Sequence, residues 1–438
     1  MSQLNKITIS QRIELVANNK AKTYFRKGFG CARLAYNWGL AKHKEYYEQG
    51  IRKSAFDLKK EFNSIKKIEF PFVYEITKYA TQQPFINLGK AFQKFFADLK
   101  KGKVSYPRFK KKSNSSGSFY IGGDQVQIQN EKYLKIPNLG LVKMREPIKY
   151  VGKINNATIS QVANKFYVSF SMEITQEEYD RTHKPAIYKN LGLGIDIGLK
   201  SFAVLSNGLE VLAPKPLAKT ARKIKKLQRQ LSRKQHPKTK GDTTKKSRNY
   251  LKASLKLAKA HRKIANIRQD FLHKLTSSLV RYVDYFCLED LNVQGMMKNH
   301  RLAKSISDVS FFEFRRMIEY KASYLNKVIV KVDRFYPSSK TCSHCGHIKT
   351  DLTLQDRVYI CEKCNHSIDR DFNASLNLYS QIKEKIGGVP TEWTPVDLTA
   401  LQSDLAINRL ATSKVSQKWI ENEAGIQLNL SNQVFHPL

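Results

Sequence analysis

The sequence is poor in acidic residues and in cysteine. Of its 438 residues, 37 are Asp or Glu and 77 are Lys or Arg, so the formal charge at pH 7 is +40. A chain with such a surplus of one sign repels itself when compact, unless a polyanion neutralises it. Nucleic acid is the favoured polyanion, because neutralising phosphates releases counterions and gives tight, salt-sensitive binding. The charge alone also fits a ribosomal or purely structural RNA-binding protein.

Long hydrophobic runs are missing as well, which excludes insertion in a bilayer, since a spanning helix needs about 20 apolar residues. The first residues, Met1 to Asn5, lead into mixed polar sequence without the apolar core of a signal peptide. We therefore expect an intracellular chain that has no membrane partner and whose thiols stay reduced.

Four of the six cysteines form two pairs, fifteen residues apart, with the spacing of metal ligands: Cys342-x2-Cys345 and Cys361-x2-Cys364. Each pair can present two thiolates to one ion, so together they predict a tetrahedral zinc site. The alternatives are two disulfides or four unrelated core thiols, and a reducing compartment disfavours the disulfides. Zinc held by four thiolates has no open position and is structural. Cys31 and Cys287 stand alone in apolar surroundings and are predicted to be buried.

The first half of the chain predicts a strand, a helical insert and further strands. Ile7 and Ile9 alternate with polar residues, and the pattern from Gln11 to about Lys112 is helical and basic. A Ser/Asn/Gly run marks a linker at 113–118, and alternating residues predict strands up to Ile174. We expect these strands and the first one to form a small antiparallel barrel, followed by a polar linker at 176–190.

A different pattern starts at Leu191. A buried strand over 192–198 is followed by a hairpin with an Asn207-Gly208 turn. Residues 215–274 hold 21 Lys or Arg and two acids, and a break near His236-Pro237 should fold one basic helix back on another. A second strand, 285–290, ends in acids; a helix and a strand at 328–332 then lead to the cysteines. This order is the layout of a ribonuclease H-like fold.

Three carboxylates are candidate ligands for two divalent ions roughly 3.5–4 Å apart: Asp196, Glu289 and Asp371. Oxygen ligands suit Mg2+ or Mn2+. Asp196 lies in an apolar strand, where a carboxylate is costly unless it binds a cation. Each residue also has an ordinary explanation: Asp371 as a helix N-cap, and Glu289 as a surface acid at a strand end. Taken with the zinc ribbon, the three fit a nuclease better.

The chain resembles a known family at these positions. Gly194-Ile195-Asp196-Ile197-Gly198, Leu288-Glu289-Asp290-Leu291 and Asp369-Arg370-Asp371-Phe372-Asn373-Ala374 resemble the three RuvC motifs of TnpB proteins. TnpB proteins are RNA-guided nucleases of insertion sequences, related to miniature type V CRISPR effectors. The resemblance covers about residues 1–380, and it assigns the third ligand to Asp371 rather than Asp369. Ser375, where the family usually repeats Ala, is a small departure.

The resemblance implies an endonuclease with structural Zn2+, catalytic Mg2+ or Mn2+ and a noncoding guide RNA, one protein per RNA, acting in the cytoplasm of a bacterium or archaeon. Its target is double-stranded DNA beside a short adjacent motif, cut by the single RuvC site. The alternatives are a nuclease-inactive, guide-dependent repressor, disfavoured because all three acids are present, and a transposase or accessory recombination factor.

The fold that the resemblance implies is multidomain α+β. The expected parts are the first strand of a wedge-type β-barrel (1–10), a helical recognition domain (11–112), the rest of the barrel (113–185), a RuvC-like nuclease domain (186–335), a zinc ribbon that loads target nucleic acid (336–368), the last nuclease segment (369–384) and a disordered tail (385–438). After Lys385 the tail carries only Arg409, Lys414 and Lys418 as Lys or Arg.

Overall fold

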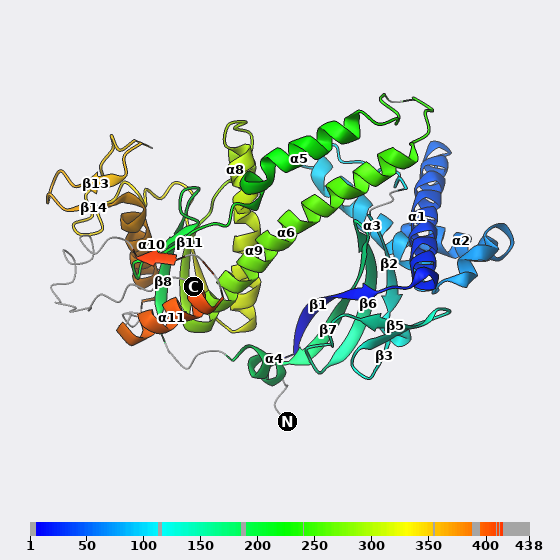
Figure 1. The fold of residues 1–438 in the computed structure, drawn as a ribbon, viewed down its shortest axis with the longest axis horizontal. Helices are drawn as coiled ribbons and strands as arrows, with labels where there is room; N and C mark the ends of the chain where they lie inside the picture. The colour runs from blue at the N-terminus through cyan, green and yellow to red at the C-terminus, as the bar shows by residue number, and fades with distance from the viewer. Residues whose placement is uncertain are drawn as a thin grey trace. The chain divides into compact units, whose positions relative to one another are not determined.

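The structure is a computed structural model, and it describes residues 6–112, 116–184, 190–239, 241–353, 355–387, 395–408, 410 and 412–414 (Figure 1). The chain divides into two compact units. Unit 1 consists of Met1–Thr182 and Lys226–Arg262, and unit 2 of His183–Lys225 and Lys263–Leu438. Among the described helices, none has the length and apolar character needed to cross a membrane.

Unit 1 is built on a seven-stranded antiparallel sheet with the order β2-β6-β7-β1-β5-β4-β3. Its strands are β1 (Lys6–Val16), β2 (Ser116–Gly122), β3 (Gln127–Gln129), β4 (Tyr133–Ile136), β5 (Gly140–Met144), β6 (Lys153–Val162) and β7 (Lys165–Thr175). Strand β1 pairs with β7 over ten residues, from Lys6 opposite Thr175 to Leu15 opposite Phe166. The alternation of buried and exposed residues along β1 and β7 shows that one face of this pair meets the core.

Two limits predicted for unit 1 are wrong. The first strand continues to Val16 instead of ending at residue 10, because Ile13 and Leu15 extend the buried alternation and Ile13 pairs with Val168. Part of the predicted linker at 176–190 is helix α4 (Gln176–His183). Antiparallel pairing of the strands is confirmed, whereas closure into a barrel stays a prediction, since the described ladder runs from β2 to β3 without joining them.

The helical insert of unit 1 consists of α1 (Asn19–Glu48), α2 (Ala55–Glu69), the 3-10 turn η1 (Pro71–Glu75) and α3 (Tyr79–Leu99). Helix α1 starts where the Asn18 side chain accepts a hydrogen bond from the Ala21 N–H, and Ser54 and Asp57 form a capping box at α2. Helix α1 packs on β2 where glycine permits it: a Cβ on Gly28 would lie 2.7 Å from the Phe119 ring.

Unit 2 is built on a six-stranded mixed sheet with the order β12-β11-β8-β9-β10-β15. Its strands are β8 (Gly192–Ile197), β9 (Ala203–Leu205), β10 (Leu209–Val211), β11 (Tyr285–Glu289), β12 (Val328–Val332) and β15 (Thr412–Lys414). Strands β8, β11 and β12 are parallel, while β9, β10 and β15 are antiparallel to their neighbours. The predicted strands and the hairpin turn at Gly208, with φ +80°, are confirmed.

Helices cover both faces of this sheet. On one face, α9 (Phe311–Tyr324) and the C-terminal part of α6 (Arg248–Tyr282) form the main core with β8 and β11. On the other face lies α10 (Arg370–Ile386), packed on Cys287, Val330 and Val332 through Leu378 and Ile382. Figure 1 shows α10 and α9 on opposite sides of β8 and β11.

The basic segment forms two helices, as predicted. Helix α5 (Pro216–Ser232) and α6 are joined by a turn in which the Ser247 N–H donates to the Gln235 carbonyl (3.1 Å). Asp308, in the short helix α8 (Ala303–Val309), fixes the start of this pair of helices. Its buried carboxylate accepts from the Leu217 and Ala218 N–H groups and from Arg268 (2.8 Å).

The prediction of a disordered tail from residue 385 is wrong for its first half. Helix α10 continues to Ile386, α11 spans Pro395–Ile407, and β15 adds an edge strand to β10. Leu401, Leu405 and Leu410 are buried in the main core of unit 2. The scarcity of Lys and Arg here reflects a segment that docks on protein, not one that lacks structure. Residues 415–438 lie outside the described residues.

Leu405→Ala should lower the free energy of unfolding of unit 2 by about 2–5 kcal/mol, because it removes a buried side chain from a packed core. Ile407→Ala on the same helix is the matched control, since Ile407 is 79% exposed and should cost little. Hydrogen exchange of the unit 2 amides, measured at increasing urea concentrations, gives the free energy of unfolding of both variants. Equal effects of the two substitutions would show that α11 does not pack as described.

Candidate functional site

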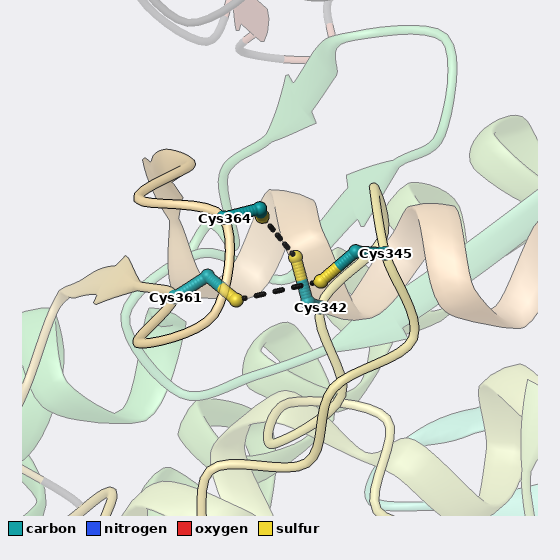
Figure 2. Close-up of side chains that lie close together, drawn as sticks. All are labelled: Cys342, Cys345, Cys361 and Cys364. Atoms are coloured by element: carbon teal, nitrogen blue, oxygen red, sulfur yellow. Dashed lines mark hydrogen bonds between the residues drawn. The ribbon is translucent and has the colours of Figure 1, made fainter.

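Four thiols meet between the two loops that carry the cysteine pairs (Figure 2). The sulfur atoms of Cys342 and Cys364 are 3.7 Å apart, and those of Cys345 and Cys361 are 3.5 Å apart. A tetrahedron with Zn–S bonds of about 2.3 Å has edges of about 3.8 Å. The four sulfur atoms therefore already stand at close to the spacing that one zinc ion requires.

The two cysteine loops have the same local structure. In the first loop the Cys342 N–H donates to the His347 carbonyl and the Gly346 N–H to the Cys342 carbonyl; in the second, Cys361 bonds His366 and Asn365 bonds Cys361 in the same way. Gly346 and Asn365 occupy equivalent positions with φ of +74° and +57°. Glycine and asparagine adopt this conformation at low cost, which explains their place after each pair.

Burial opposes ionisation of the buried thiols of the cluster. It raises the pKa of Cys342 to about 12, against the opposing effect of backbone donors. Burial also disfavours ionisation of Cys361, but hydrogen bonds from the N–H groups of Cys364 and Lys363 and from the neighbouring thiols of Cys364 and Cys345 together outweigh it and bring its pKa to about 6. Since the ligands of zinc must be deprotonated, the donor set fits a zinc ion, which Cys342, Cys345, Cys361 and Cys364 would hold without an open position.

The cysteine loop is tied to α10 by two asparagines one helical turn apart. Asn373 donates to the Thr341 carbonyl (2.7 Å) and accepts from the Ser343 N–H (2.9 Å). Asn377 donates to the carbonyls of Ser338 and Thr341, both at 2.7 Å. Both amides are buried. The sequence offers Asn373 within the motif at the helix start, but it does not show that these side chains hold the metal loop.

Helix α10 crosses β8 at contact distance over Gly194. A Cβ built on Gly194 would lie 2.1 Å from the Ser375 carbonyl oxygen and 2.5 Å from the Tyr379 nitrogen. Both atoms belong to helix backbone, so no side-chain movement can make room. The glycine is therefore required by this crossing, which brings the start of α10 to the strand that carries Asp196.

Asp196 and Glu289 lie side by side on the face of the sheet that α10 covers. Strands β8 and β11 are parallel, with Ile195 opposite Leu288, so the next residues of the two strands are Asp196 and Glu289. Since side chains alternate between faces, Asp196 shares the face of Gly194, and Glu289 that of Cys287. The Ser338 hydroxyl donates to the Glu289 carboxylate and so orients it.

Asp196 is half-buried and faces like charge. Loss of water raises the pKa of its carboxyl well above the usual value, and the carboxylates of Glu289 and Asp371 raise it further, against the opposing effect of Arg370. A carboxyl in this position opposes its own ionisation unless a cation compensates. The structure thus brings together the three predicted acids, from β8, β11 and α10.

The start of α10 separates two neighbouring acids. Asp369 is the N-cap: its carboxylate accepts from the N–H groups of Asp371 and Phe372, each at 3.0 Å. Asp371 stands within the first turn, and desolvation and Asp369 raise its pKa, while Arg370 and Arg357 lower it. The helix-cap explanation considered for Asp371 therefore belongs to Asp369, and the Asp371 carboxylate is available as a ligand.

Asp290, next to Glu289, has a different environment. Its carboxylate binds Arg315 and Arg334, and the hydrogen bond from Arg315 lowers its pKa. Among the described residues, the four cysteines are the one group of three or more His, Cys, Asp or Glu with ligand atoms all within 4.8 Å of each other. The three carboxylates thus converge more loosely than the thiols.

Gly194→Ala should destabilise unit 2 or displace α10, because its Cβ meets helix backbone. We expect a loss of at least about 1–3 kcal/mol, the usual cost of overpacking. Gly30→Ala is the control: nothing lies within 4 Å of its Cβ position in α1, so the exchange should stabilise by up to about 1 kcal/mol. Thermal and urea unfolding measure both, and an unchanged Gly194→Ala protein would contradict the close crossing.

Cys361→Ser should yield a zinc-depleted, less stable protein, because the binding energy of a structural zinc ion contributes to folding. Elemental analysis and unfolding with and without a chelator measure this. Cys31→Ser is the control and should keep its zinc, since Cys31 is a buried residue of unit 1, whereas the four clustered cysteines belong to unit 2. A wild-type protein that purifies without zinc from zinc-containing medium would end this interpretation.

Three family models match parts of the chain. The first, IS605 OrfB, described as "Probable transposase", matches residues 169–300; a "Cas12f1-like, TNB domain" matches 311–378 and a "Helix-turn-helix domain" matches 5–52. The described part of this range, residues 6–52, contains β1 and the single long helix α1. The second model includes the four cysteines and Asp371.

Curated relatives span most of the chain. A "Putative RNA-guided DNA endonuclease" of Streptomyces pristinaespiralis is 33% identical over 355 residues, 80% of this chain and 83% of the relative. The "Putative RNA-guided DNA endonuclease InsQ" of Escherichia coli K12 is 27% identical and covers 84% and 90%. A solved Cas12f1-sgRNA-target DNA complex has 14% identity and a TM-score of 0.48, over 85% of this chain and 99% of that one. By its motifs and its identity to the first relative, this chain belongs to the TnpB family, the IS605 OrfB proteins of insertion sequences.

Proposed function

We propose that this protein is an RNA-guided endonuclease that cuts double-stranded DNA with one site formed by Asp196, Glu289 and Asp371. The observation that carries the proposal is the convergence of these three acids, from segments far apart in sequence, on the α10 face of the sheet. Their mutual repulsion is a cost that a stable fold without such a site would avoid. The names of the curated relatives support the same activity.

The fold assignments belong to the proposal. The order of parallel β12, β11 and β8, followed by the antiparallel hairpin β9-β10, supports a RuvC-like, ribonuclease H-like nuclease domain. The cysteine loop between β12 and α10 is then a zinc ribbon inserted in this domain. In unit 1, the antiparallel sheet would be a wedge-type barrel and α1 to α3 a recognition domain.

Mg2+ or Mn2+ held by the three carboxylates would activate water and stabilise the leaving oxygen of a phosphodiester. The protein's own residues prepare this site. Ser338 holds the Glu289 carboxylate, Asp369 fixes the first turn of α10, and through it the backbone of Asp371. Arg370 and Arg357 lie 3.7 and 3.9 Å from the Asp371 carboxylate and offset part of the local negative charge.

Guide RNA and DNA would bind through charge rather than through the acids. The helices α5 and α6 carry most of the 21 Lys and Arg residues at 215–274 and offer a polyanion-binding surface. Pairing with the guide would read the target, after the recognition domain and barrel open the duplex beside a short motif. We propose one protein per guide RNA.

The test of this function has two parts. RNA that copurifies with the protein, expressed together with its native downstream DNA, is sequenced to identify the guide. The complex is then mixed with a plasmid library that carries the target beside randomised flanking sequence, with Mg2+ or with EDTA. We expect cleavage of both strands at a fixed distance from one flanking motif, in Mg2+ and not in EDTA.

Asp196→Asn, Glu289→Gln and Asp371→Asn, each made singly, should abolish cleavage and leave guide and target binding nearly unchanged. The reason is that affinity comes from basic contacts and base pairing, whereas hydrolysis needs the carboxylates. Ser338→Ala, which removes only the group that orients Glu289, should reduce the rate by about 10–100-fold. Single-turnover cleavage and filter binding on the same preparations separate the two effects.

Asp369→Asn is the matched control for Asp371→Asn. An amide oxygen can still cap the helix, so Asp369→Asn should cut at close to the wild-type rate. Full cutting by Asp371→Asn together with loss of cutting by Asp369→Asn would reverse the assignment of the third ligand. Tight guided binding without cutting by the wild type would favour the repressor, and strand transfer without a guide would favour a transposase.

A further inference from the structure

A groove of about 440 Å³ opens beside Glu289 in unit 2. Its walls come from the ends of β8 and β11, the segment after β11 with the short helix α7 (Val293–Met296), the first half of α9 and the end of β12. Every lining residue belongs to unit 2. The volume lies in the range of small-ligand sites, roughly 300–1,000 Å³. The groove therefore has room for about one nucleotide. Because α9 forms one wall, the groove opens on the sheet face opposite α10, and Glu289, at the end of β11, is the one of the three proposed metal ligands that lines it.

Five charged residues of the groove pair with one another: Asp290, Arg315, Glu319, Lys331 and Arg334. Arg316 pairs instead with Glu313, which does not line the groove. Arg315 lies between Asp290 and Glu319, the latter at 3.2 Å. Arg334 donates from Nε to the Asp290 carbonyl and from Nη2 to its carboxylate, both at 3.1 Å, and Lys331 lies 3.1 Å from Glu319. These pairs neutralise the acids of the wall, so a phosphate backbone that enters the groove meets no uncompensated carboxylate apart from Glu289.

One wall of the groove is an exposed aromatic ring. Phe312 is 64% exposed, although its neighbours Phe311 and Phe314 are buried in the main core of unit 2. The ring adds nothing to that core, and an exposed aromatic side chain is what proteins use to stack unpaired bases. Phe335 is even more exposed, at 87%, but it does not line the groove.

We propose that this groove holds one unpaired nucleotide of the DNA strand beside the scissile phosphate, with its base stacked on Phe312. The proposal rests on the nuclease function proposed above and adds a substrate-contact residue to it. A base can stack there only when unpaired and unstacked from its neighbour, so the groove would accept single strands and reject duplex. Because the wall is nearly neutral, stacking rather than counterion release would supply the attraction.

The first test measures stacking without cleavage. Phe312→Trp and the control Phe335→Trp are titrated with a short oligothymidylate and with a duplex of equal length, in EDTA. The chain already has three tryptophans, so the wild-type signal is subtracted from that of each variant. We expect the added fluorescence of Phe312→Trp to be quenched by the single strand and not by the duplex, and that of Phe335→Trp to change little. Quenching at 312 should persist at a higher salt concentration, with enough DNA added to keep the protein saturated. Equal responses at both positions would overturn the proposal.

The second test measures positioning. Phe312→Ala in the guide complex should lower the single-turnover cleavage rate by about tenfold and spread the cut positions, whereas Phe312→Tyr should restore both and Phe335→Ala should match the wild type. Rates and cut positions unchanged by Phe312→Ala, in a wild type that cuts, would overturn the groove proposal and leave the nuclease intact. Selective quenching at 312 with a wild type that never cuts would instead support a single-strand site and reject the nuclease.

Discussion

The crossing of α10 over β8 is the contact on which the proposed site depends. Only a glycine at 194 lets helix backbone approach the strand so closely, and this approach sets Asp371 near Asp196, which Glu289 also faces. The Asp369 cap then fixes the first turn, and Leu378 and Ile382 anchor the helix on β11 and β12. Apolar packing and the absence of a side chain at Gly194 thus hold three acids from distant segments near one another, although their charges repel.

The cysteine cluster serves this arrangement from outside the sheet. The segment between β12 and α10 contains the short strand pair β13 (Val358–Ile360) and β14 (Ser367–Asp369). Its apolar core is small, chiefly Tyr359 and Ile368 beside the cysteines, and short segments of this kind usually need a metal or a disulfide to keep their structure. Through Asn373 and Asn377 the loop holds α10, and through Ser338 it reaches Glu289. A zinc ion that performs no chemistry would therefore still determine the geometry of two of the three carboxylates.

Acidic residues are scarce in this chain, and the structure shows where they are used. Asp290, Asp308 and Asp284 are neutralised by Arg or Lys and hold elements of unit 2 together. Asp196 lies instead where burial and two other acids raise its pKa. Sites that work against stability in this way are where function is expected, because folding alone gives no reason for them.

Local sequence determined those features that depend on a few neighbouring residues. The cysteine spacing and the turn residues Gly346 and Asn365 predicted the thiol cluster, and hydrophobic runs predicted β8, β11 and β12. The end of β1 depends on its pairing with β7, more than a hundred residues away, and the docking of Leu401 and Leu405 depends on a core built from distant segments. The roles of Asn377 and Ser338 depend on partners a few tens of residues away. Spacing alone also could not choose between Asp369 and Asp371; the family resemblance did. The tertiary structure adds a physical reason that favours Asp371, since the Asp369 carboxylate accepts from the helix N–H groups of Asp371 and Phe372, and the Asp371 carboxylate does not cap the helix.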